Sequence, residues 1–133
     1  MRVVQETENL FRLTRFGMIN CFLVREADGF ALVDTGLRGS AGAILRAAAR
    51  LGASIRRIVL THAHIDHIGS LDRLMAAVPS PELAIGQREA RLLAKDLTLD
   101  AGEKGKGSSD SSAQRRGPAD CWWMETASVL LRR

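Results

Sequence analysis

The stretch Thr61-His62-Ala63-His64-Ile65-Asp66-His67-Ile68-Gly69 decides how the rest of the chain is interpreted. It contains all three histidines of the protein, interleaved with one carboxylate. The apolar, β-branched run Ile58-Val59-Leu60 precedes it and is typical of a buried strand. Gly69 and Ser70 then open a segment with helical spacing. The pattern predicts that the motif lies on a loop between a strand and a helix.

Three imidazoles and one carboxylate so close together indicate a metal site, because both groups are good ligands for a borderline cation such as Zn²⁺. On an extended loop His62 and His64 point the same way, so one metal can take both. Asp66 and His67 are adjacent and are expected to diverge, which suits a second metal near the first. The alternative is a set of surface-loop or helix-terminal polar residues, which the density of the cluster disfavours.

The order His-x-His-x-Asp-His, after a hydrophobic strand that ends in Thr61, closely resembles the signature of the metallo-β-lactamase superfamily. Residues 19–24 and 31–36 also resemble early strands of that family, and the likeness extends over residues 1–100. The resemblance implies an α/β fold with a mixed sheet, as the N-terminal half of an αββα sandwich, and is nearest to glyoxalase II-like or lactonase-like members.

This resemblance also implies roles for the motif. His62 and His64 would bind a first zinc ion, and Asp66 and His67 a second. Asp66 would also be catalytic, beside the bridging hydroxide. Iron and manganese are alternatives to zinc.

Supporting residues are expected behind these ligands. Asp34 ends a predicted strand, where a buried carboxylate needs hydrogen-bond partners. The family resemblance implies that it holds the histidine loop in place, and the competing interpretation is a turn former before Gly36. Thr61 and Gly69, at the two ends of the motif, are assigned to the same supporting group.

The function that follows from the resemblance is zinc-dependent hydrolysis, with a metal-bound hydroxide attacking the ester, thioester or lactam carbonyl of a small-molecule substrate. The chain has no histidine outside the motif, so it offers two protein ligands per metal where catalytic zinc has three. We therefore expect a truncated chain with impaired activity. The alternatives are a non-catalytic fragment that associates through an exposed sheet face, and a nuclease-type member of the family.

Other segments have recognisable patterns. Residues 19–25 and 30–33 are predicted to form a hairpin, because Asp28-Gly29 suits the turn. A helix over 41–51, capped by Ser40, leads to a strand that ends at Leu60, which predicts a parallel crossover. A helix from Leu71, with Ser70 as candidate cap, is expected to be followed by a strand over 83–85 and a helix over 87–95.

Composition limits the class of protein. The 133 residues, 46% of them hydrophobic, suit one domain with a core. No run has the length or character of a leader or a membrane span, which predicts a cytoplasmic protein without membrane association.

The net charge of +4 comes from basic residues dispersed among acidic ones, as in Glu89-Ala90-Arg91. This pattern favours a solvated surface and argues against nucleic-acid binding. Cys21 is predicted to be a buried free thiol.

Residues 101–133 break the pattern, because Gly and Ser replace apolar residues over most of the segment. We expect disorder there. Reading Asp120-Cys121-Trp122-Trp123-Met124-Glu125 in a shifted frame gives a strand-like sequence, so an out-of-frame ending entered between 105 and 118 is one hypothesis. A genuine variable tail with a small apolar docking segment is the other.

Overall fold

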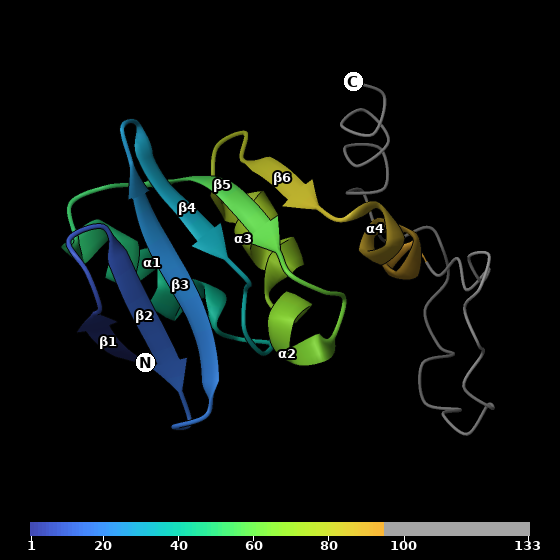
Figure 1. Cartoon of the computed structure of the whole chain (residues 1–133), viewed down its shortest axis with the longest axis horizontal. Helices are drawn as coiled ribbons and strands as arrows, with labels where there is room; N and C mark the ends of the chain where they lie inside the picture. Colours follow the sequence, from blue (N-terminus) through green and yellow to red (C-terminus); the bar gives the residue numbers. More distant parts are fainter. Residues whose placement is uncertain (95–133) are drawn as a thin grey trace.

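The computed structural model describes residues 1–94. Their fold is a single six-stranded mixed sheet whose strands lie side by side in chain order (Figure 1). The strands are β1 (Arg2–Gln5), β2 (Leu10–Arg15), β3 (Ile19–Glu26), β4 (Gly29–Val33), β5 (Ile55–Leu60) and β6 (Glu82–Ile85). The helices are α1 (Ala41–Arg50), α2 (Ile65–Ile68), α3 (Leu71–Ala77) and α4 (Gln87–Leu93). The α/β class with a mixed sheet is thus confirmed.

The first four strands form an antiparallel meander. The predicted hairpin between β3 and β4 is present, with Glu26 paired to Gly29. Gly29 has a φ of 151°, and a Cβ atom there would lie 2.5 Å from the carbonyl oxygen of Ser54. The glycine therefore serves both the turn and the close approach of the chain that leads into β5.

The last three strands are parallel to one another. Helix α1 connects β4 to β5, as the predicted crossover requires, and α2 and α3 connect β5 to β6. Because β4, β5 and β6 run the same way, their carboxyl ends meet at one edge of the sheet. This edge carries the histidine motif.

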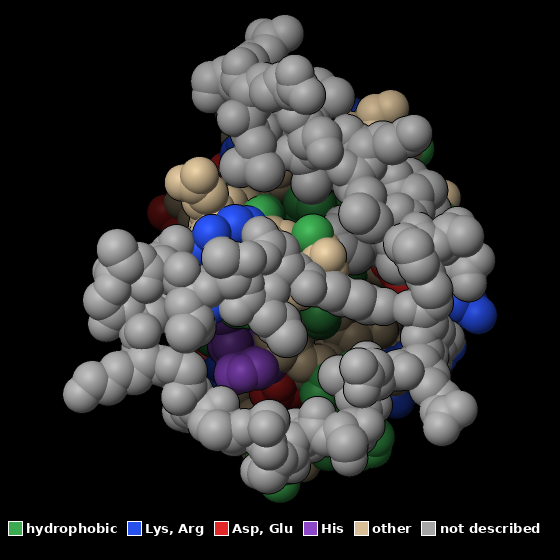
Figure 2. All heavy atoms as spheres, turned by 90° about the vertical axis from the view of Figure 1, so that its right-hand side faces the viewer, with side chains coloured by type: hydrophobic (Ala, Val, Ile, Leu, Met, Phe, Trp, Pro, Cys, Tyr) green, Lys and Arg blue, Asp and Glu red, His purple; other side chains and the backbone are tan. Residues whose placement is uncertain are grey.

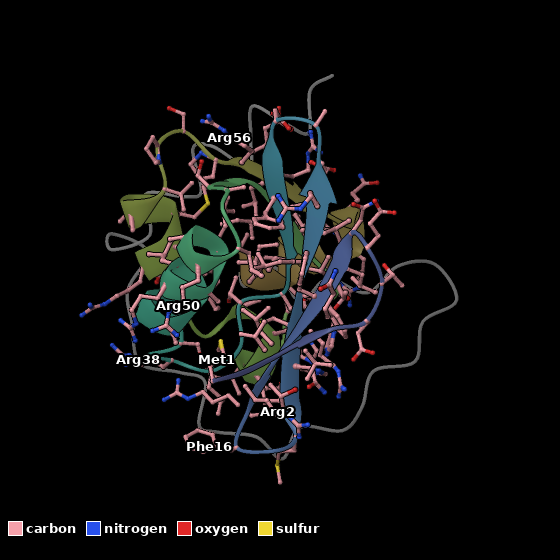
Figure 3. All side chains as sticks on the ribbon, turned by 90° about the vertical axis from the view of Figure 1, so that its left-hand side faces the viewer. Met1, Arg2, Phe16, Arg38, Arg50 and Arg56 are labelled. Atoms are coloured by element: carbon pink, nitrogen blue, oxygen red, sulfur yellow. The ribbon has the colours of Figure 1, made fainter. Side chains whose placement is uncertain are left out.

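Helices α1 and α3 lie on one side of the sheet (Figures 1 and 3). The alternating strand residues on that side are fully buried and form the core with the helices. The largest fully buried side chains are Ile44 from α1, Leu74 from α3 and, from the strands, Leu13, Leu23, Phe30, Leu32 and Ile58. Cys21 belongs to this core as a free buried thiol, as predicted.

The two predicted serine caps are wrong. Ser40 and Ser70 precede α1 and α3, but neither hydroxyl caps its helix. Ser40 Oγ accepts a hydrogen bond from Arg15 Nη1 at 2.8 Å, and Ser70 Oγ donates to the Leu37 carbonyl oxygen at 2.7 Å. Both side chains are buried, so these tertiary partners satisfy the hydroxyls in place of the helix ends.

No helix within residues 1–94 is long and apolar enough to cross a bilayer. The predictions made for residues 101–133, including disorder and an out-of-frame ending, lie outside the described residues.

Candidate metal centre

The histidine motif begins where β5 ends. Residues 61–64 leave the strand in an irregular conformation, and α2 then begins at Ile65 (Figure 1). The predicted loop therefore holds only the first half of the motif, since Asp66 and His67 lie in a short helix. His64 stands at the N-cap position with an extended backbone, φ −87° and ψ 152°.

All three imidazoles come together at this edge of the sheet. The ring centroids of His62 and His67 are 3.8 Å apart, and those of His62 and His64 are 4.7 Å apart. His62 and His67 are half-buried, whereas His64 is exposed. Figure 2 shows histidine side chains grouped on this face, next to acidic ones. The sequence motif is therefore also a spatial cluster.

The prediction that Asp66 and His67 diverge is wrong. Asp66 Oδ2 lies 3.3 Å from His67 Nε2. Alternation by about 180° applies to a strand, whereas successive residues of a helix are rotated by about 100°. Formation of α2 therefore lets neighbouring side chains of the motif approach each other.

Asp34 contacts two residues of the motif, Thr61 and His67. It directly follows β4, is only 5% exposed and has a φ of 60°. Its carboxylate accepts hydrogen bonds from the Thr61 N–H at 2.9 Å and the Thr61 hydroxyl at 2.8 Å. Its Oδ2 also lies 2.7 Å from His67 Nδ1. One buried carboxylate thus fixes residues 61 and 67 relative to β4.

These contacts favour one arrangement of the imidazole protons. If His67 donates its Nδ1–H to Asp34, the lone pair resides on Nε2. Thr61 Oγ1 lies 3.0 Å from His62 Nδ1. Because the Thr61 hydroxyl proton goes to Asp34, that oxygen accepts Nδ1–H from His62, which leaves His62 Nε2 as an acceptor too.

Backbone contacts fix α2 from behind. The carbonyl oxygen of His67 accepts from the Thr35 N–H at 2.6 Å and the Thr35 hydroxyl at 2.8 Å. A Cβ atom on Gly69 would lie 2.6 Å from both Arg38 N and Ile65 O. Gly69 is therefore required for the close approach of two backbone segments. Thr35 was missed from the sequence, although it adjoins Asp34.

Glu89 was also missed, because its sequence context was interpreted as solvated surface. It lies in α4 and is half-buried. Its Oε2 accepts a hydrogen bond of 2.6 Å from the N–H of Ala63, the residue between His62 and His64. No sequence pattern signals this contact, since it joins positions 26 residues apart.

The donor chemistry of the cluster fits a divalent cation such as zinc, iron or manganese. Within residues 1–94, however, no three or more His, Cys, Asp or Glu side chains are arranged to hold one ion. His67 illustrates the reason, since Nδ1 is next to Asp34 and Nε2 faces Asp66. The four motif side chains lie together but do not complete a coordination sphere. Their ligand roles stay predictions.

Comparison with known proteins decides the family. The sequence profile of the Metallo-beta-lactamase superfamily matches residues 14–122. The chain belongs to the metallo-β-lactamase superfamily. The resemblance drawn from the His-x-His-x-Asp-His motif is thereby confirmed.

Two curated proteins are similar in sequence to this chain. The uncharacterized protein YobT of Bacillus subtilis is 39% identical over 102 residues, which cover 74% of this chain and 43% of YobT. The probable metallo-hydrolase YflN of the same organism is 38% identical over 56 residues, covering 40% of this chain and 21% of YflN.

Among solved structures, BJP-1, a subclass B3 metallo-β-lactamase of Bradyrhizobium japonicum, has a TM-score of 0.62 at 28% identity. The match covers 70% of this chain and 36% of BJP-1. The class B3 di-zinc metallo-β-lactamase LRA-12, from an Alaskan soil metagenome, has a TM-score of 0.56 at 26% identity, with 62% and 32% of the two chains covered. The chain thus spans less than half the length of these superfamily members.

Proposed function

We propose that this chain supplies the metal-binding part of a zinc-dependent hydrolase. His62 and His64 form one pair of ligands and Asp66 and His67 the other. Superfamily membership supports a metal-dependent hydrolase, and the di-zinc relative supports zinc as the metal. The substrate class we propose is an ester, thioester or lactam of a small molecule.

The observation that carries the proposal is the anchoring of the motif by Asp34. A cation site needs imidazoles whose ligating nitrogen is directed at the ion and whose rings are held in place. Asp34 Oδ2 at 2.7 Å from His67 Nδ1 meets this need for His67, and Thr61 extends it to His62. A surface cluster without function would not require a buried carboxylate behind it.

Zinc, when bound, supplies an activated water and polarises the carbonyl of the substrate. The four motif residues would hold the zinc. Asp66 is more accessible than the adjacent His67, with 46% of its side chain exposed against 24%. Asp66 is therefore positioned to face both the cation and an incoming substrate.

The test is zinc binding by the full chain, measured by equilibrium dialysis. We expect the double variant His62→Ala/His64→Ala to lose at least about 10-fold in affinity, because one pair of ligands is removed. Glu82→Ala is the control, since Glu82 is an exposed carboxylate paired with Arg57. Equal zinc affinity in the double variant and the unmodified chain would overturn the proposal.

Turnover provides a second measurement. With two protein ligands per ion, we expect weak zinc affinity and little thioester hydrolysis by this chain alone. Substantial hydrolysis that disappears in Asp66→Ala would show that the chain is more complete as a catalyst than we propose.

A further inference from the structure

Two carboxylates from opposite sides contact the backbone of the histidine loop. In the sheet, β5 lies between β4 and β6. Asp34 directly follows β4 and accepts the Thr61 N–H at 2.9 Å. Glu89 lies in α4, beyond β6, and accepts the Ala63 N–H at 2.6 Å. The segment that leaves β5 is therefore bound by a residue from each neighbouring strand connection.

We propose that Glu89 is a positioning residue for the metal centre, which fixes the Ala63 peptide and thereby sets the relative placement of His62 and His64 as cation ligands. This inference rests on the proposed function, because it assumes that the two histidines bind a cation together. The role rests on one contact. Glu89 accepts a hydrogen bond from the peptide N–H that lies between His62 and His64 in the chain.

The strength and location of this hydrogen bond support the role. A hydrogen bond to an ionised carboxylate is shorter and about twice as strong as a neutral one, and the contact is partly buried. Residues 61–64 have no regular secondary structure, and side-chain carboxylates accept the backbone N–H groups of Thr61 and Ala63. Asp34 fixes residues 61 and 67, and Glu89 supplies the restraint between the first two histidines.

The competing explanation is that Glu89 only stabilises α4. It lies in the first turn of that helix, where an acidic side chain interacts favourably with the helix dipole. Asp72 offers a matched comparison, since it is the acidic residue in the first turn of α3, a helix that also has seven residues. Asp72 is exposed and belongs to α3, the helix that directly follows the motif in the chain.

The experiment uses Co²⁺ as the probe, with the full chain and the variants Glu89→Ala, Glu89→Gln and Asp72→Ala. We expect Glu89→Ala to weaken Co²⁺ affinity by about 10-fold and to change the visible absorption spectrum of bound Co²⁺, because the ligand geometry is altered. Glu89→Gln keeps a carbonyl acceptor but removes the charge, and it should recover most of the affinity. Asp72→Ala should bind as the unmodified chain does.

A second measurement reports the contact without any metal. The amide proton of Ala63 should resonate downfield in the metal-free chain and move upfield in Glu89→Ala, as seen in ¹H–¹⁵N correlation spectra. An unchanged Ala63 resonance, or Glu89→Ala that binds Co²⁺ as tightly and with the same spectrum as the unmodified chain, would overturn the inference alone. Absence of Co²⁺ binding by the unmodified chain would instead overturn the proposed function, and this inference with it.

Discussion

Asp34 combines a left-handed backbone with a buried charge. Its φ of 60° lies in a region that Asp and Asn tolerate better than other residues with side chains. Its carboxylate is surrounded by the Thr61 N–H, the Thr61 hydroxyl and His67 Nδ1. The strain and the burial are both accounted for if this residue exists to hold the motif.

We predict that Asp34→Ala lowers the free energy of unfolding by about 3 kcal/mol, because three polar groups lose a buried partner. Urea denaturation measures this change. Asp34→Asn is the control, since Asn keeps the size and the tolerance of positive φ, and it should lose less. A urea midpoint for Asp34→Ala equal to that of the unmodified chain would contradict the clamping role.

Cys21 shows what burial does to a thiol without a partner charge to help it ionise. Desolvation, with a smaller contribution from the nearby charge of Asp34, raises the pKa of Cys21 to about 12. We predict that in a Cys121→Ser background the folded chain does not react with a thiol reagent at pH 8, and that it reacts in urea. Rapid labelling of the folded chain would show that Cys21 is more accessible than the structure implies.

The same raised pKa has a consequence for stability at high pH. The folded state keeps Cys21 protonated, whereas the unfolded chain ionises it above its ordinary pKa of about 9.0. The contribution of the Cys21 thiol to the free energy of unfolding is therefore complete below pH 8 and declines as the pH rises toward 12. The decline in urea midpoint between pH 8 and 11 should be smaller in Cys21→Ala, and an identical slope in both chains would exclude this contribution.

At the scale of elements, the parallel half of the sheet builds the site. The carboxyl ends of β4, β5 and β6 meet at one edge, so Asp34, the histidine motif and Glu89 are brought together although they are distant in sequence. Helix α2 then packs against the chain that follows β4, through the Thr35 contacts and the approach at Gly69. The position of α2 sets the position of Asp66 and His67.

We predict that Gly69→Ala destabilises the fold by about 2 kcal/mol, because its methyl group would meet backbone atoms of Arg38, Ile65 and Gly36 within 2.9 Å. Gly42→Ala is the matched control. Gly42 lies inside α1, where the added methyl meets only the end of the flexible Arg46 side chain.

The Gly42 control should be neutral or more stable by about 0.5–1 kcal/mol, because alanine favours a helix more than glycine does. Thermal unfolding of the two variants side by side gives the comparison. If Gly69→Ala and Gly42→Ala lost the same stability, the close backbone contacts at Gly69 would not explain the destabilisation.

At the scale of the whole molecule, the two faces of the sheet differ. Helices α1 and α3 cover one face, and the figures show no described helix crossing the other (Figures 1 and 3). Strand residues that alternate with the core ones are on this second face, and several are apolar and only partly buried: Leu10, Phe22, Val24, Val33 and Val59. Association through this face stays a prediction.

We predict that the chain associates through this second face, so that gel filtration with light scattering gives a mass above that of the monomer. Phe22→Lys should shift the mass toward the monomer, because a charge opposes burial of the face. Met18→Lys is the control, since Met18 is 76% exposed in the turn between β2 and β3. A monomer at every concentration would contradict association.

The class of fold, the hairpin, the parallel crossover and the superfamily could all be predicted from the amino-acid sequence. Local patterns suffice for these, because apolar periodicity and turn residues act over a few positions and the His-x-His-x-Asp-His motif is contiguous. Asp34, Thr61 and Gly69 were predicted to support the ligands; Asp34 contacts Thr61 and His67, and the supporting roles stay predictions.

The hydrogen-bond partners of several side chains could not be predicted, because they depend on packing between distant segments. The hydroxyls of Ser40 and Ser70 take tertiary partners, since burial makes any unpaired hydroxyl costly and nearer partners replace the helix ends. Asp66 approaches His67 because packing folds that part of the motif into a helix. Glu89 reaches Ala63 because β6 lies beside β5 in the sheet, and strand neighbours are set by the packing of the whole molecule, not by proximity in the chain.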